Sequence, residues 1–150
     1  MTDTKKPRLI GINHVAIEVG DIDEALAWYA QIFEFSLRGK GERNAFIDMG
    51  DQFVNMTLVK DYAVPGEEKR HIGFVVDDRS RIIELARAAG ARMVEGPFLD
   101  FLDPWGNRLE IIEYSNIQFS KTPGVMRGMG LDLDKNEKAR KELAEKGMAE

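Results

Sequence analysis

The sequence predicts an α+β fold of two similar βαβββ modules, paired as a partly open sheet around a cavity, with a helix in the C-terminal tail. Two observations predict this fold. An eight-residue block that begins at His14 recurs without a gap from His71, and a helix pattern and three short strand patterns follow each block. The two histidines are 57 residues apart, and Gly50 and Gly106 keep almost the same offset, 56 residues. Such a repeat indicates two copies of one structural unit.

The first module is expected over residues 9–60. Residues 9–19 alternate between apolar and polar side chains, which predicts a strand with one face on the core and the other on a polar cavity. Asp21 is a candidate N-cap with Glu24 three residues later, and apolar residues then recur at helical spacing. Three short strands are expected near residues 34–37, 44–49 and 52–60, separated by glycine-containing turns.

The second module repeats this order over residues 70–114, after a linker at residues 61–69. A strand is expected at 70–76, a helix capped by Asp78 at 79–89, and strands at 92–94, 98–102 and 108–114. In the tail, 115–150, we expect a segment up to Gly130 that covers the cavity or a neighbouring subunit. A charged helix capped by Asp134 and ending near Lys146 should follow. The chain of 150 residues is expected to form one domain.

Strand parity indicates the candidate site. With helices outside and the remaining sheet faces meeting around a cavity, His14, His71 and Glu110 would line that cavity. Two imidazoles and one carboxylate form a ligand set that suits a divalent metal with open positions. The alternatives are two hydrogen-bonded structural histidines and a solvated strand carboxylate.

Composition narrows the function classes. The chain has no cysteine, so any metal must be held by nitrogen and oxygen atoms. Its net charge of -5 argues against a nucleic-acid partner, and no apolar run is long enough to predict a membrane helix. A small-molecule substrate and a cytoplasmic location are the expectations.

Several motifs resemble the vicinal oxygen chelate superfamily, also called glyoxalase/bleomycin resistance/dioxygenase proteins, over about residues 9–114. They are Asn13-His14-Val15 before an Asp-started helix with Trp28-Tyr29, the His71-led strand, and the segment from Phe101 through Asp103-Pro104-Trp105-Gly106-Asn107 to Glu110. The resemblance implies paired βαβββ modules, a divalent metal bound by His14, His71 and Glu110, and a homodimer.

The chain departs from one family pattern. Family sites with four side-chain ligands take a second carboxylate from the last strand of the first module, where this chain has Asn55, or Val54 under the 56-residue offset. Its absence weighs against a standard lactoylglutathione lyase and favours three ligands, with Asn55 as a substrate hydrogen-bonding residue. The longer polar loop and cationic cluster of the fosfomycin-modifying branch are also missing, so fosfomycin modification is not predicted.

Three other residues are weaker candidates. Glu18 shares the parity of His14 and is a candidate acid or base, although a solvated strand-end carboxylate is the simpler interpretation. With both histidines used as ligands, Tyr114 or Tyr62 could supply a catalytic phenol. Trp105 could flank the cavity mouth, stack on a substrate or contact a partner.

The expected function is therefore a metal-dependent enzyme acting on a small organic substrate with adjacent oxygens. Ring-cleaving dioxygenation is expected with Fe(II), and lyase or isomerase chemistry with Zn, Ni, Mn or Co; the sequence favours neither. The alternative from another class is a small-molecule sequestering protein without catalysis. A third possibility is a module that keeps its metal only for structure.

Overall fold

A computed structural model describes residues 6, 12–63 and 66–149 of the chain. The first module contains β1 (His14–Val19), α1 (Ile22–Ala30), β2 (Ser36–Lys40), β3 (Asn44–Asp48) and β4 (Phe53–Leu58). The second contains β5 (Ile72–Val76), α2 (Arg79–Ala88), β6 (Arg92–Val94), β7 (Asp100–Leu102) and β8 (Arg108–Glu113). The predicted βαβββ repeat is confirmed. Residues 9–11 of the first predicted strand and residues 64–65 of the predicted linker lie outside the described part.

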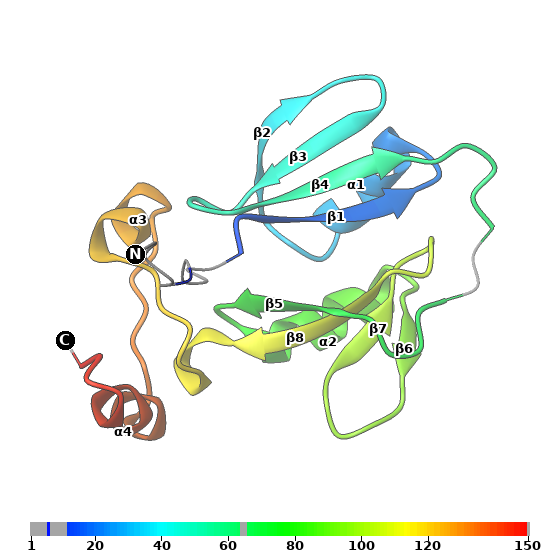
Figure 1. Cartoon of the computed structure of the whole chain (residues 1–150). Helices are drawn as coiled ribbons and strands as arrows, with labels where there is room; N and C mark the ends of the chain where they lie inside the picture. Colours follow the sequence, from blue (N-terminus) through cyan, green and yellow to red (C-terminus); the bar gives the residue numbers. More distant parts are fainter. Residues whose placement is uncertain (1–5, 7–11, 64–65, 150) are drawn as a thin grey trace.

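Each module folds into a four-stranded mixed sheet, and the two sheets have the same order, β1-β4-β3-β2 and β5-β8-β7-β6 (Figure 1). The first strand of each module runs parallel to the last one, and the other neighbours are antiparallel. The α1 helix begins where the Asp21 carboxylate accepts a hydrogen bond from the Glu24 backbone N–H, and Asp78 caps α2 in the same way through Arg81. Both predicted caps are confirmed.

Alternation places one face of each sheet in the core. In β1, Ile17 and Val19 are buried whereas His14, Ala16 and Glu18 are exposed. In β8, Leu109 and Ile111 are buried and Glu110 is partly exposed. The strand parity deduced from the sequence therefore holds in both modules.

The modules pack together through α1, which is a difference from the expected arrangement with helices outside. The Trp28 indole donates a hydrogen bond to the Ala89 carbonyl at the end of α2, and its ring centroid lies 6.3 Å from that of Phe101 in β7. The rings of Phe33, just after α1, and Phe74 in β5 meet edge to face at 5.8 Å. Apolar residues on two faces of α1 join both modules in one core, and no strand of one sheet is paired with a strand of the other among the described residues.

The tail forms a short 3-10 turn η1 (Tyr114–Asn116) and two helices, α3 (Pro123–Gly128) and α4 (Glu137–Glu145), which lie to one side of the sheets (Figure 1). Lys121 donates to the Met49 carbonyl and pairs with Asp51, so the segment before α3 is attached to the turn between β3 and β4. A Cβ atom on Gly50 in that turn would lie 2.7 Å from the Met129 sulfur, so the turn and the end of α3 approach closely.

The start of α4 corrects one sequence prediction. Asn136, not Asp134, is the N-cap, and its side chain accepts a hydrogen bond from the Ala139 backbone N–H. Its backbone N–H donates to the Ser115 carbonyl and its amide donates to Asn116, which fixes this residue against η1. Asp134 instead forms a 3.7 Å ion pair with Arg140. No helix among the described residues has the length and apolar character needed to cross a membrane.

Candidate metal and substrate site

The second module brings two of the predicted ligands into contact. Gly73 in β5 is the register partner of Glu110 in β8, so the two residues lie on the same face of the sheet. His71, two residues before Gly73, lies on that face as well. The His71 Nε2 atom lies 3.2 Å from Glu110 Oε2. Their side chains are 45% and 20% exposed, so the pair is reachable from solvent.

The orientation of the His71 ring is fixed from its other side. Nδ1 lies 2.9 Å from the Lys69 carbonyl oxygen, which only accepts hydrogen bonds. Nδ1 must therefore carry the ring N–H in the neutral imidazole, and the lone pair of Nε2 faces the Glu110 carboxylate. Metal-binding histidines are commonly held in this way by a backbone carbonyl.

Arg108, two residues before Glu110, is paired with another carboxylate. Arg108 donates to Asp100 through Nε at 2.7 Å and through a terminal nitrogen at 2.6 Å. It also donates to the Glu68 carbonyl. Asp100 is 4% exposed and is the register partner of Glu110 in β7. This buried ion pair was missed by the sequence reasoning, because the partners are eight residues apart across a hairpin.

His14 lies on the open face of the first sheet. Its ring stacks on Phe53 in β4, with centroids 4.7 Å apart and planes 11° from parallel. Nδ1 lies 2.8 Å from the Asn13 side-chain oxygen, so His14 has the same tautomer as His71, with its lone pair on Nε2. Within the described part of one chain, no three His, Asp or Glu side chains are grouped closely enough to hold a metal. His14 is thus separate from the His71–Glu110 pair in a single chain.

Asn55 and Glu18 share the His14 face, as their parity predicts. Asn55 is the register partner of Ala16, and its side-chain oxygen accepts a hydrogen bond from Asn44 at 3.1 Å. Glu18 is exposed four residues beyond His14, which corresponds to roughly 13 Å along a strand. Glu18 is thus too distant to touch a group held at His14.

Tyr114 and Trp105 are 7% and 8% exposed. Because both are buried, neither side chain can face a substrate. Tyr114 belongs to η1 and packs edge to face on Phe119 in the tail. The Trp105 indole packs on Gly20, where an added Cβ atom would lie 2.9 Å from its Nε1. Both side chains serve packing, so neither is carried into the proposed site. Burial and nearby Glu18 raise the pKa of Tyr62, which keeps that phenol neutral.

Asp103, which the sequence suggested only as a turn residue, is an organising group between the modules. It is fully buried and accepts hydrogen bonds from the Tyr29 hydroxyl at 2.7 Å, from the backbone N–H groups of Trp105 and Asn107, and from the Asn107 amide. Burial raises the pKa of Asp103, and these hydrogen bonds oppose that effect. The Asn107 amide also donates to the Glu18 carbonyl, which connects this turn to β1.

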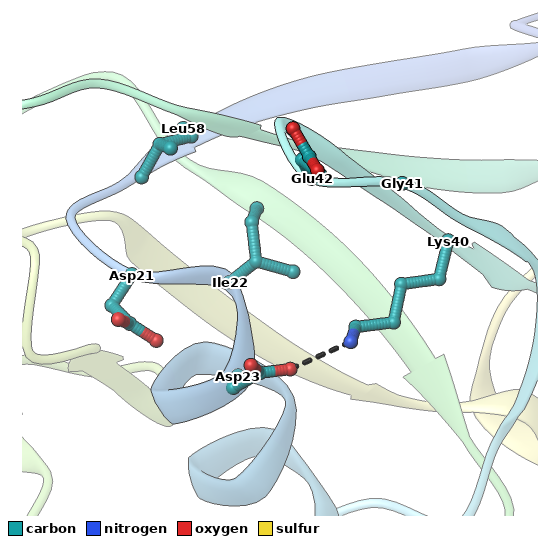
Figure 2. Close-up of a pocket in the computed structure, with 7 residues that line it drawn as sticks. All are labelled: Asp21, Ile22, Asp23, Lys40, Gly41, Glu42 and Leu58. Atoms are coloured by element: carbon teal, nitrogen blue, oxygen red, sulfur yellow. Dashed lines mark ion pairs between the residues drawn. The ribbon is translucent and has the colours of Figure 1, made fainter.

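One hollow in the surface of the described residues lies away from the histidines. Its volume is about 570 Å³, and Figure 2 shows the lining residues Asp21, Ile22, Asp23, Lys40, Gly41, Glu42 and Leu58. Leu58 ends β4, at the opposite end of the strand from Phe53, the neighbour of His14. Lys40 and Asp23 form a 2.7 Å ion pair across it. This hollow contains none of the predicted site residues.

Comparisons with known proteins agree with the architecture. A family model for the Glyoxalase/Bleomycin resistance protein/Dioxygenase superfamily matches residues 11–111. The metallothiol transferase FosB of Shouchella clausii is 28% identical over 120 residues, which cover 67% of this chain and 78% of FosB. The chloroplastic probable lactoylglutathione lyase of Arabidopsis thaliana is 28% identical over 67% of this chain, but the match spans only 35% of that protein.

One solved structure illustrates the shared fold. A mutant of the fosfomycin resistance protein FosX from Listeria monocytogenes, in complex with Mn(II) and 1S,2S-dihydroxypropylphosphonic acid, superposes with a TM-score of 0.58 at 18% identity. The superposition covers 69% of this chain and 90% of FosX. At this identity the likeness concerns the fold.

Proposed function

Because the chain belongs to the glyoxalase/bleomycin resistance protein/dioxygenase superfamily, we propose that it is a metal-dependent enzyme acting on a small organic substrate with two adjacent oxygen atoms. One observation carries this proposal, the contact of His71 Nε2 with Glu110 Oε2. A nitrogen lone pair and a carboxylate oxygen at 3.2 Å repel each other unless a proton or a cation lies between them. A proton there gives an ordinary ion pair, and a divalent cation is the alternative that we propose, because an imidazole nitrogen and a carboxylate oxygen are donor atoms such ions accept.

The third ligand in this proposal is His14 from a second copy of the chain. His14 has the same tautomer as His71 but is separate from it in one chain. A two-fold homodimer would place the first module of one copy opposite the second module of the other and would form two equal sites. The open faces that carry His14 and Glu110 are the surfaces that would meet.

Each residue has a defined task at such a site. His71, positioned by the Lys69 carbonyl, and His14, positioned by Asn13, donate nitrogen lone pairs, and Glu110 balances part of the positive charge. A divalent ion held there supplies a Lewis acid for adjacent substrate oxygens. The Asn44–Asn55 pair offers amide groups to the substrate on the His14 side.

The metal decides between the two reaction classes. We leave Fe, Mn, Ni, Zn and Co open, as in the sequence analysis; Mn(II) in the Listeria protein supports a divalent ion. Chain purified without added metal should contain close to one divalent ion per chain. Iron would direct the assays to ring cleavage of catechols, and the other metals to lyase and isomerase substrates.

The same preparation tests the alternative of a sequestering protein. Metal with turnover of a substrate that has adjacent oxygens would support the enzyme. Failure to bind any of the five metals after reconstitution would reject it and favour ligand binding without catalysis. A metal without turnover, whose removal unfolds the chain, would indicate a structural ion.

A further inference from the structure

Strand β2 presents one arginine, Arg38, on the His14 face, next to an irregularity in the strand. The register between β2 and β3 pairs Leu37 with Ile47 and Gly39 with Phe46, which leaves Arg38 as an extra residue, a β-bulge. Bulges redirect side chains and are frequent beside active sites. Arg38 shares the face of Ser36, Phe46 and Phe53, and its guanidinium lies over the Phe53 ring, with Cζ 4.8 Å from the ring centroid.

Arg38 and His14 lie on opposite sides of that ring. β1 and β2 are the two edges of the sheet, and β4, which carries Phe53, lies between them. His14 therefore stacks on Phe53 from one side and Arg38 from the other. The Phe46 ring meets Phe53 edge to face at 5.8 Å. The result is a row of imidazole, benzene ring and guanidinium across the open face.

The positive charge of Arg38 is not neutralised by a contact within the described residues. No ion pair joins it to a carboxylate there, even though Asp48, the register partner of Phe53 in β3, is close in the sheet. The contact of Cζ with the ring uses none of the guanidinium N–H groups as hydrogen-bond donors to an anion, so they are available to bind an anion in a bidentate manner. By contrast, neighbouring Lys40 is already paired with Asp23.

We propose that Arg38 binds a carboxylate of the substrate, while the apolar part of the substrate passes along Phe46 and the uncovered edge of the Phe53 ring and its adjacent oxygens reach the metal beside His14. This inference rests on the proposed function, because His14 marks the metal end of the row. It adds a substrate class, namely acids in which a short apolar spacer separates the carboxylate from the two adjacent oxygens.

Two small chelators form a matched pair of probes. Benzohydroxamate offers two adjacent oxygens and a benzene ring, and 4-carboxybenzohydroxamate adds a carboxylate at the far end of the same ring. Affinities for both are measured on the full chain, with Mn²⁺ and with EDTA. The native chain should bind the carboxylated probe about tenfold more tightly, since a charge-assisted hydrogen bond of this kind contributes roughly that factor.

Variants assign this preference to Arg38. Arg38→Gln should abolish the preference for the carboxylated probe, and Arg38→Lys should keep part of it. Lys40→Gln, which alters the neighbouring paired cation, should leave the preference unchanged. An equal preference in native chain and Arg38→Gln would overturn the assignment. Circular dichroism of each variant checks that the fold is retained.

The EDTA arm separates this inference from the proposed function. In EDTA both probes should bind much more weakly, because their adjacent oxygens need the metal, so the preference that depends on Arg38 is measured with Mn²⁺. Equal benzohydroxamate affinity with Mn²⁺ and with EDTA would contradict the metal site. The comparison of the two probes in native chain and Arg38→Gln would still test whether Arg38 binds the carboxylate.

Discussion

At the scale of single residues, the environment of each side chain decides whether it serves chemistry or packing. His71 and Tyr114 are both polar aromatic residues at strand ends, but His71 is exposed and opposite a carboxylate whereas Tyr114 is buried. Sequence parity predicted His71, because alternation fixes the face of a strand residue. Parity could not predict that Tyr114 and Trp105 are buried, since burial outside regular strands depends on tertiary packing.

The Tyr29–Asp103 hydrogen bond gives a prediction at this scale. Tyr29→Phe leaves a buried carboxylate with one donor fewer, so we expect the free energy of unfolding to fall by about 1–3 kcal/mol. Chemical denaturation at neutral pH measures this loss. Phe33→Leu, at a partly buried residue beside the same ring, gives a comparison in which packing changes and the hydrogen bond stays.

The same tyrosine predicts a dependence on alkaline pH. Burial, followed by the charge of Asp103, raises the pKa of Tyr29 well above 10, the usual value that it regains on unfolding. The folded state therefore keeps a proton that the unfolded state loses above pH 10, and the stability from Tyr29 falls as pH rises. Native chain should lose more stability between pH 9 and 11 than Tyr29→Phe; equal slopes would contradict the pKa shift.

At the scale of elements, local signals predicted helices well and irregular features poorly. Asp21 and Asp78 cap their helices because a short acidic side chain before an apolar periodic segment satisfies the first free N–H groups. The Arg38 bulge breaks the two-residue period, so no alternation pattern predicts it. The sequence prediction placed the cap of α4 at Asp134, and contacts of Asn136 with η1, which no local pattern shows, place it at Asn136 instead.

One lysine contributes several of the contacts that attach α4 to the preceding tail. Lys135 donates to the carbonyls of Tyr114 and Phe119, and its ammonium lies 3.4 Å from the centroid of the Tyr114 ring. Lys135→Met should release α4 from η1 and speed amide hydrogen exchange in residues 137–145 about tenfold, while metal content stays at the native value. Lys138→Met, at an exposed position of α4, is the control. Unchanged exchange in Lys135→Met would show that α4 is held by other contacts.

At the scale of the whole molecule, the sequence predicted two modules but not how they meet. Apolar periodicity shows which face of α1 is buried without showing against what, and Trp28 and Phe33 turn out to contact the second module. The two histidine faces are left open as a result. A shared site in a homodimer follows as the proposal that uses both faces.

Mixing two inactive variants tests this shared site. His14→Ala and Glu110→Gln each remove one ligand, so neither homodimer should hold its metal. After unfolding and refolding together, random pairing makes half of the dimers mixed, and each mixed dimer has one complete site. About a quarter of the native metal content should return. If all three ligands came from the same chain, mixing would restore none.

The central claim is that His71 and Glu110 bind a divalent metal, and a calorimetric titration of metal-free protein with Mn²⁺ tests it most directly. Native chain should bind about one ion per chain, and His71→Ala should bind at least a hundredfold more weakly, beyond the loss typical of an outer-shell change. Glu84→Gln, an exposed carboxylate on α2, should match the native chain. Equal affinity in His71→Ala and native chain would contradict the account.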